Sequence, residues 1–166
     1  MYKFFTFLIL GFFACHASNK PDPPPNVIEP SELAKIKLTD LENHAIKLDT
    51  YKGKTIFINF WATWCKPCVE EMLSIEKAQS IMKDNEVVFL LASSEGIEEI
   101  KEFSRNHNYQ FNYVHLGNGE ALNLQALPTT FIFNPKGSLV FSEMGSRNWD
   151  ENENINLIKN IINHHD

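Results

Sequence analysis

The chain has 166 residues, of which 43% are hydrophobic and 22% are charged. This length and composition fit one globular domain with a real hydrophobic core, and a second domain would be cramped. The formal net charge is −6, and the sequence contains no basic stripe that could neutralise phosphates. The charge therefore argues against a nucleic acid partner.

The N-terminus carries the features of an export signal. Lys3 is followed by an apolar run over residues 4–13, which is too short to span a bilayer as a helix but suits the hydrophobic region of a signal peptide. We therefore expect residues 1–14 to be removed on export.

Cys15 decides how the exported protein would be attached. Ala14 and Cys15 resemble the lipobox of bacterial lipoproteins, in which the cysteine after a small residue is acylated and anchors the protein to a membrane. Phe12 and Phe13 depart from that pattern, because small or aliphatic residues are expected there. Cleavage after Ala17 is the alternative, and it would release a soluble protein.

Residues 15–32 form a predicted tether. They hold five prolines and few apolar side chains, so they should be extended, at about 3.1 Å per residue where the chain is polyproline-like. Such a tether would hold the following domain, residues 33–166, clear of a membrane. A disordered terminus without that purpose fits equally well if Cys15 is not acylated.

From residue 33 onward the hydrophobic pattern alternates between strands and helices, which predicts an α/β fold. A polar turn joins the first two strands as a hairpin, and Asn134-Pro135-Lys136-Gly137 joins the last two as an antiparallel pair. Residues 55–60 are dense in β-branched and aromatic side chains and predict a central strand. Strands are predicted over residues 36–38, 45–48, 55–60, 87–92, 111–114, 130–133 and 139–141, and helices over 65–82, 95–107, 120–124 and 154–162.

Two cysteines directly follow the predicted central strand. Cys65 and Cys68 are three residues apart and can close on one another as a disulfide. A cysteine at a helix start is stabilised as the thiolate by the helix dipole, and the neighbouring Lys66 adds a positive charge. Pro67 fits the first turn of that helix. We therefore expect Cys65 to be the exposed nucleophile and Cys68 to be buried.

A wider set of residues resembles the thioredoxin superfamily. It comprises the run from Asn59 to Cys68, Asn-Phe-Trp-Ala-Thr-Trp-Cys-Lys-Pro-Cys, and Leu127-Pro128-Thr129-Thr130 before a later strand. Within the superfamily, the hairpin, Tyr51-Lys52-Gly53-Lys54, Glu71 and the export signal resemble the TlpA/ResA-like membrane-associated thiol-disulfide oxidoreductases. The resemblance implies a thioredoxin-like fold: a central mixed sheet flanked by helices, with an N-terminal β-hairpin.

The resemblance also implies a reaction. Cys65 would attack a substrate disulfide, and Cys68 would resolve the mixed disulfide, so the pair itself is the redox centre and no other cofactor is expected. The implied partners are protein disulfide substrates and a membrane thiol protein that donates electrons. The implied location is the periplasmic side of a bacterial membrane, with cytochrome c maturation as one process served. The direction of electron flow rests on the resemblance alone.

Five residues are expected to contact the substrate. In the resembled family the proline at Pro128 follows a cis peptide bond, and the backbone of Leu127 pairs with an extended substrate segment. Trp64 would offer a flat apolar contact, and Lys66 and Pro67 complete the set. A trans proline in an ordinary turn is the alternative.

Glu71 has two interpretations. Asn59 stands where thioredoxins often place a buried aspartate, and it cannot take a proton. In the TlpA/ResA-like branch a glutamate at the position of Glu71 would accept the proton of Cys68 instead. The family usually has a proline where this chain has Leu73, so Glu71 could equally be a solvated acid in the first helical turn.

The sequence gives less support to three other functions: metal binding, peroxide reduction and binding without catalysis. The histidines show no spacing that joins Cys65 and Cys68 into a zinc site, so no metal is expected. A peroxiredoxin-type peroxidase would need a Pro-x-x-x-Thr-x-x-Cys pattern that the residues before Cys65 do not reproduce. A non-catalytic binding or chaperone-like lipoprotein with an incidental disulfide is the remaining alternative. The six histidines are His16, His44, His107, His115, His164 and His165.

Overall fold

The computed structural model describes residues 32–163. The predicted signal, Cys15 and all but the last residue of the predicted tether lie outside the described residues, as do His164 and His165. Within residues 32–163, no helix is both long enough and apolar enough to cross a bilayer.

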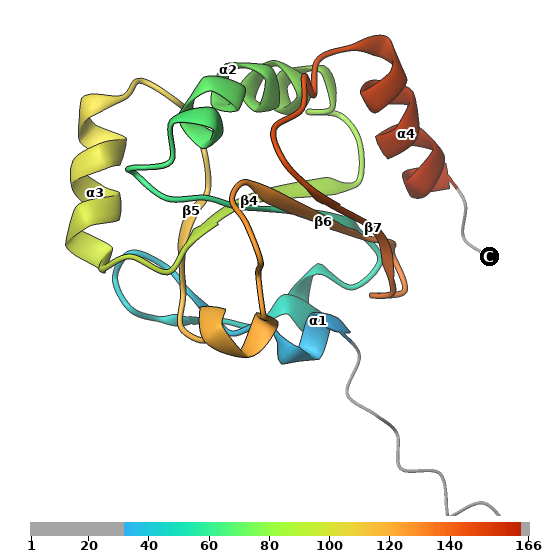
Figure 1. The fold of residues 1–166 in the computed structure, drawn as a ribbon. Coiled ribbons are helices and arrows are strands. Elements are labelled where there is room, and N and C mark those ends of the chain that lie inside the picture. The colour runs from blue at the N-terminus through green and yellow to red at the C-terminus, as the bar shows by residue number, and fades with distance from the viewer. Residues whose placement is uncertain (1–31, 164–166) are drawn as a thin grey trace, which may run out of the picture.

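A seven-stranded sheet forms the centre of the molecule (Figure 1). Its strand order is β2-β1-β5-β4-β3-β6-β7, with β3, β4 and β5 parallel to one another and the other neighbours antiparallel, so the sheet is mixed as expected. The strands are β1 (Leu38–Thr39), β2 (Ala45–Ile46), β3 (Thr55–Phe60), β4 (Val87–Ser93), β5 (Tyr113–Leu116), β6 (Thr129–Phe133) and β7 (Leu139–Met144).

Helices cover both faces of the sheet. Helices α2 (Lys66–Ile81), α3 (Ile97–Asn106) and α4 (Asn152–Asn163) pack on one face, where Met72, Ile75 and Ala78 of α2 are fully buried. The short helix α1 (Glu32–Lys35) and two 3₁₀ segments, η1 (Leu48–Tyr51) and η2 (Gly119–Leu122), lie against the other. The apolar stripe of α2 has the helical spacing that the sequence predicts, because these side chains must reach one face.

Some boundaries differ from the prediction. The hairpin strands β1 and β2 are only two residues long, and the predicted helix over residues 120–124 is the 3₁₀ turn η2. The strand predicted over residues 111–114 is β5, shifted two residues later, because its pairing with β4 begins where Tyr113 meets Leu91. Phe111 keeps its apolar contact with the core from the loop before β5, so periodicity alone could not place the strand end.

Strand β3 sets the place of the chemistry. It lies between β4 and β6, and all six of its side chains are buried. Because β3 and β6 are antiparallel and Phe60 pairs with Thr129, the chain leaving β3 runs beside the chain entering β6. The Cys65–Cys68 motif and the Leu127-Pro128 segment therefore meet at one edge of the sheet.

Candidate active site

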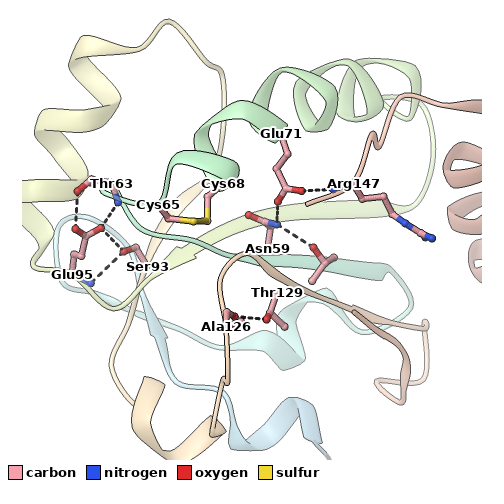
Figure 2. Close-up of a disulfide and its surroundings, with 11 residues drawn as sticks. Asn59, Thr63, Cys65, Cys68, Glu71, Ser93, Glu95, Ala126, Thr129 and Arg147 are labelled. Atoms are coloured by element: carbon pink, nitrogen blue, oxygen red, sulfur yellow. Dashed lines mark hydrogen bonds between the residues drawn. A yellow bond between two sulfur atoms is a disulfide. The ribbon is translucent and has the colours of Figure 1, made fainter. Parts of the chain in front are cut away.

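The two cysteines form a disulfide at the start of α2 (Figure 2). Cys65 is the residue before the helix, with extended backbone angles, and Cys68 lies in the first turn. Their Cα atoms are 5.3 Å apart. Pro67 occupies the first turn, where the missing N–H of proline costs no helical hydrogen bond.

The prediction of an exposed Cys65 is wrong for this disulfide form. Cys65 is only 4% exposed, and Cys68 is completely buried as expected. The Cys65 sulfur is bonded to that of buried Cys68, and both cysteines belong to the apolar cluster that contains Trp61. The surface at this point is instead formed by Trp64, which is 74% exposed.

Lys66 is the cation beside the disulfide. Its ammonium group is exposed and lies 3.6 Å from the exposed carboxylate of Glu70, one helical turn further on. An ion pair this open to water contributes little to stability. The positive charge next to Cys65 is therefore partly balanced by an acid on the same helix.

Pro128 enters β6 through a cis peptide bond after Leu127, as the family resemblance implied. Pro128 is buried, and its carbonyl accepts a hydrogen bond from the N–H of Gly145 at 2.8 Å. The hydroxyl of Thr129 donates to the carbonyl of Ala126 at 2.7 Å and holds the preceding turn. Leu127 is half-buried at the rim of the core, next to the chain that leaves β3.

Glu71 is a buried acid and not a solvated one. It is 4% exposed, and its carboxylate accepts hydrogen bonds from Asn59 Nδ2 at 2.6 Å and from the N–H of Arg147 at 2.9 Å (Figure 2). Burial raises the pKa of this carboxyl to about 7, although both hydrogen bonds oppose the rise. Helix α2 continues without a break through Leu73, which is 51% exposed, so the burial of Glu71 needs no proline there.

The carboxyl group of Glu71 is linked to β6 through Asn59. The same Nδ2 of Asn59 also donates to Thr130 Oγ1 at 3.0 Å, so one amide nitrogen on β3 connects α2 to β6. On its other side Glu71 lines a polar pocket of about 320 Å³. The pocket is lined by Pro67, Glu70, Glu71, Ser146, Arg147 and Asn148.

A second acid holds the chain just ahead of the cysteines. The carboxylate of Glu95 accepts hydrogen bonds from the N–H of Thr63 at 2.6 Å, from the Thr63 hydroxyl at 2.7 Å and from the Ser93 hydroxyl at 3.1 Å. In Figure 2 this group lies on the opposite side of the disulfide from Glu71. Glu95 thus fixes the turn that leads from β3 to Cys65.

Sequence reasoning did not single out Glu95, Ser93 or Arg147, and it named Thr130 only as part of the motif after Pro128. Ser93 ends β4 and Glu95 follows it, so the parallel pairing of β3 and β4 brings them to the edge where Thr63 lies. That signal was present in the strand pattern, because the carboxyl ends of parallel strands meet at one edge. No such signal exists for Arg147, because it reaches Glu71 through its main-chain N–H.

Among residues 32–163, the histidines make their hydrogen bonds away from this site. In the part of the chain that the structure describes, no three His, Cys, Asp or Glu side chains are grouped so that they could hold a metal ion. His115 lies on β5 at the opposite side of β4 from β3, with its Nδ1 3.4 Å from the hydroxyl of Thr39.

Comparison with known proteins agrees with this geometry. The model of the AhpC/TSA family matches residues 31–142. The thiol-disulfide oxidoreductase ResA of Bacillus thuringiensis subsp. konkukian is 30% identical over 126 residues, which are 74% of this chain and 73% of that protein. This chain is a ResA-like member of the AhpC/TSA family. ResA of Geobacillus kaustophilus is 35% identical over 106 residues, 61% of each chain.

The fold of this ResA-like chain matches solved structures. A thiol:disulfide interchange protein from Bacteroides sp. superimposes with a TM-score of 0.65 at 23% identity, over 78% of this chain and 87% of that one. At this level of identity the similarity shows the fold alone. It confirms the thioredoxin-like fold expected from the sequence.

Burial of Glu71 should make the protein less stable as pH rises. The pKa of this carboxyl is about 7 in the folded chain against an ordinary 4.5, so between these values the folded chain binds a proton that the unfolded chain has lost. The free energy of unfolding should therefore fall by about 3 kcal/mol across that interval. Glu71→Gln should remove this fall, measured by urea unfolding at pH 4.5 to 8. Glu70→Gln is the exposed control, and equal pH dependence in wild type and Glu71→Gln would contradict the expectation.

Glu95→Ala should loosen the turn before Cys65. Two donors of Thr63 and the hydroxyl of buried Ser93 would lose their acceptor, which we expect to lower the free energy of unfolding by about 1–3 kcal/mol. The rate of disulfide exchange should fall as well, because the turn that positions Cys65 would no longer be held. Glu102→Ala, an exposed acid on α3, is the control. Wild-type stability and rate in Glu95→Ala would show that this carboxylate does not hold the turn.

Proposed function

We propose that this protein reduces disulfide bonds in extracytoplasmic proteins through the Cys65–Cys68 pair. The observation that carries the proposal is the disulfide at the start of α2, with Pro128 on the neighbouring chain and the buried acid Glu71 one turn further along the helix. In a ResA-like chain this combination suits a dithiol that alternates between reduced and oxidised forms.

The first step uses Cys65 of the reduced protein. As the residue before α2, Cys65 lies where unpaired N–H groups and the helix dipole favour the thiolate. The thiolate attacks one sulfur of the substrate disulfide. A bond forms between that sulfur and Cys65, the substrate disulfide breaks, and the other substrate sulfur leaves as a thiolate that takes a proton from water.

The second step uses Cys68 and Glu71. These residues are three positions apart on α2 and so lie on neighbouring parts of one helix face. The Cys68 thiol gives its proton to the Glu71 carboxylate, whose pKa of about 7 makes it a stronger base than an ordinary glutamate. The Cys68 thiolate then attacks the Cys65 sulfur. The second substrate sulfur is released, and two electrons have passed from the protein to the substrate.

Substrate binding is assigned to the surface around the disulfide. Trp64 presents an exposed flat ring beside Cys65, and Lys66 and Pro67 are the first two residues of α2. The backbone of Leu127 lies where an extended peptide could add to the chain entering β6. Pro128 has no N–H to compete with the cysteine sulfurs.

The N-terminal sequence supports the proposed location, and the family resemblance supports the proposed partners. Acylation of Cys15 would anchor the domain to a bacterial membrane, and residues 15–32 would let it turn toward its substrates. In an oxidising compartment the pair stays reduced only if a membrane thiol protein supplies electrons. Apocytochromes c awaiting haem attachment are one substrate class for such a reductase.

Redox titration of the Cys65–Cys68 pair tests the direction of electron flow. A reductant should have a potential near the value of about −270 mV typical of thioredoxin, whereas a potential near about −120 mV would overturn the proposal in favour of an oxidant. Cys68→Ser should trap substrates as mixed disulfides with Cys65, and Cys65→Ser should trap none. Hydrogen peroxide consumption that depends on Cys65 would instead favour a peroxidase.

Cys15→Ala tests the anchor. If Cys15 is acylated, the wild-type protein should be found in the membrane fraction. The Cys15→Ala variant should either be absent from that fraction or keep its signal peptide. The measurement is fractionation with mass spectrometry of the N-terminal peptide. An unacylated N-terminus after Ala17 would contradict the anchor and leave the reductase proposal standing.

A further inference from the structure

The segment that joins β7 to α4 runs along the helix that carries the cysteines. This segment, residues 145–150, meets three side chains of α2: Glu71, Ser74 and Lys77. They are spaced by three residues and so follow one side of the helix. The linking segment is therefore attached to the active-site helix over two turns, beginning at the buried acid.

Ser74 holds the segment at its middle. Its hydroxyl donates to the carbonyl of Arg147 at 3.2 Å and accepts the N–H of Trp149 at 3.1 Å. The single proton of this hydroxyl is shared with the carbonyl of Glu71, which lies closer, at 2.8 Å. The Ser74 hydroxyl is thus within hydrogen-bond distance of the main chain on both sides of residue 148.

Gly145 holds the segment at its start. Its N–H donates to the carbonyl of Pro128 at 2.8 Å, and its φ of +100° belongs to the region that favours glycine. A Cβ added there would meet no atom within 4 Å, so an alanine would disturb only the backbone angles. Between these two attachments the N–H of Arg147 donates to Glu71 Oε2 at 2.9 Å.

We propose that Ser74 and Gly145 are positioning residues for Glu71, which hold the main chain of Arg147 so that its N–H points at the Glu71 carboxylate. This rests on the proposed function, in which Glu71 takes the proton of Cys68. Neither residue touches the substrate or the sulfurs in this role. Both act through one main-chain donor.

The physical reason is the cost of burying a charge. An ionised carboxylate out of water is stable only if donors replace its hydration. Glu71 has two donors at hydrogen-bond distance, Arg147 N–H and the Asn59 amide, which also serves Thr130, and the side chain of Trp149 also lowers its pKa. Moving either donor changes how readily Glu71 gives up its proton.

The charged side chains around Glu71 form ion pairs with other residues. Glu70, on the same helix, is exposed and lies 3.6 Å from Lys66. The Arg147 guanidinium is paired with Glu143 at 3.3 Å, and Lys77 is paired with Asp150 at 3.0 Å. The elements that pack beneath Glu71 offer the neutral side chains of Asn59 and Thr130. Among the groups of the linking segment, the main-chain N–H of Arg147 is therefore the donor at hydrogen-bond distance from Glu71, and the side chain of Trp149 adds to its effect.

The test is a direct titration of Glu71 in the oxidised protein. The ¹³C shift of its carboxyl carbon is followed against pH in wild type, Ser74→Ala and Gly145→Ala. Because the lost N–H stabilises the ionised form, each variant should move the midpoint upward, by about one pH unit for complete loss of the hydrogen bond. A residue that only supports the fold would lower stability and leave this midpoint in place.

Two matched controls lie away from the site. The Ser104 hydroxyl makes the same intrahelical bond as Ser74, to the carbonyl three residues earlier, but on α3. Gly53 has a φ of +89° and lies just before β3, at the end far from the cysteines, and a Cβ added there would also meet no atom within 4 Å. Ser104→Ala and Gly53→Ala should keep the wild-type midpoint.

The outcomes separate this inference from the proposed function. Unchanged midpoints in folded Ser74→Ala and Gly145→Ala would overturn the inference, and so would equal shifts in the two controls. The role of Glu71 as proton acceptor is tested separately, by the rate at which Cys68 resolves a mixed disulfide in Glu71→Gln. A wild-type rate there would overturn the proton-transfer role while the midpoints still report on Ser74 and Gly145.

Discussion

Strand β3 is hydrogen-bonded along both edges, in parallel to β4 and antiparallel to β6, and this double pairing organises the whole site. Its side chains are buried on both faces of the sheet, so a shift by one residue would exchange the side chains that the two cores pack around, Ile56, Ile58 and Phe60 on one face and Phe57 on the other. With β3 fixed, the carboxyl end of β4 brings Glu95 to one side of the emerging chain. The amino end of β6 brings Pro128 to the other, and the cysteines lie between them.

The chemistry depends on how this scaffold treats negative charge. Thiolates at Cys65 and Cys68 and a carboxylate at Glu71 would lie within the first two turns of α2, and the disulfide form removes two of these three charges. Burial makes Glu71 hold its proton more tightly than an exposed acid does. Asn59 suits this arrangement because an amide in place of a second buried acid can donate to Glu71 without adding charge.

Local patterns account for much of the fold. The stripe formed by Met72, Ile75 and Ala78 predicts α2, because a helix on the surface of a sheet buries one face. The dense run of β-branched and aromatic residues predicts β3, because such a continuous apolar run is typical of a strand covered on both faces. The ends of short elements were harder to place. Phe111 packs on the core from a loop, so its apolar character did not show where β5 begins.

The sequence by itself determined the thiol pair, the helix that begins beside it and the proline before β6, because each is written in neighbouring residues. Only the tertiary structure decided that Cys65 is covered in the disulfide form and that Glu71 is buried while Glu70 is exposed. It also brought Glu95 and the main chain of Arg147 to the site across 32 and 76 residues of chain. Burial and main-chain donation depend on which segments meet in space, and no side-chain pattern along the chain records a contact made by a backbone N–H.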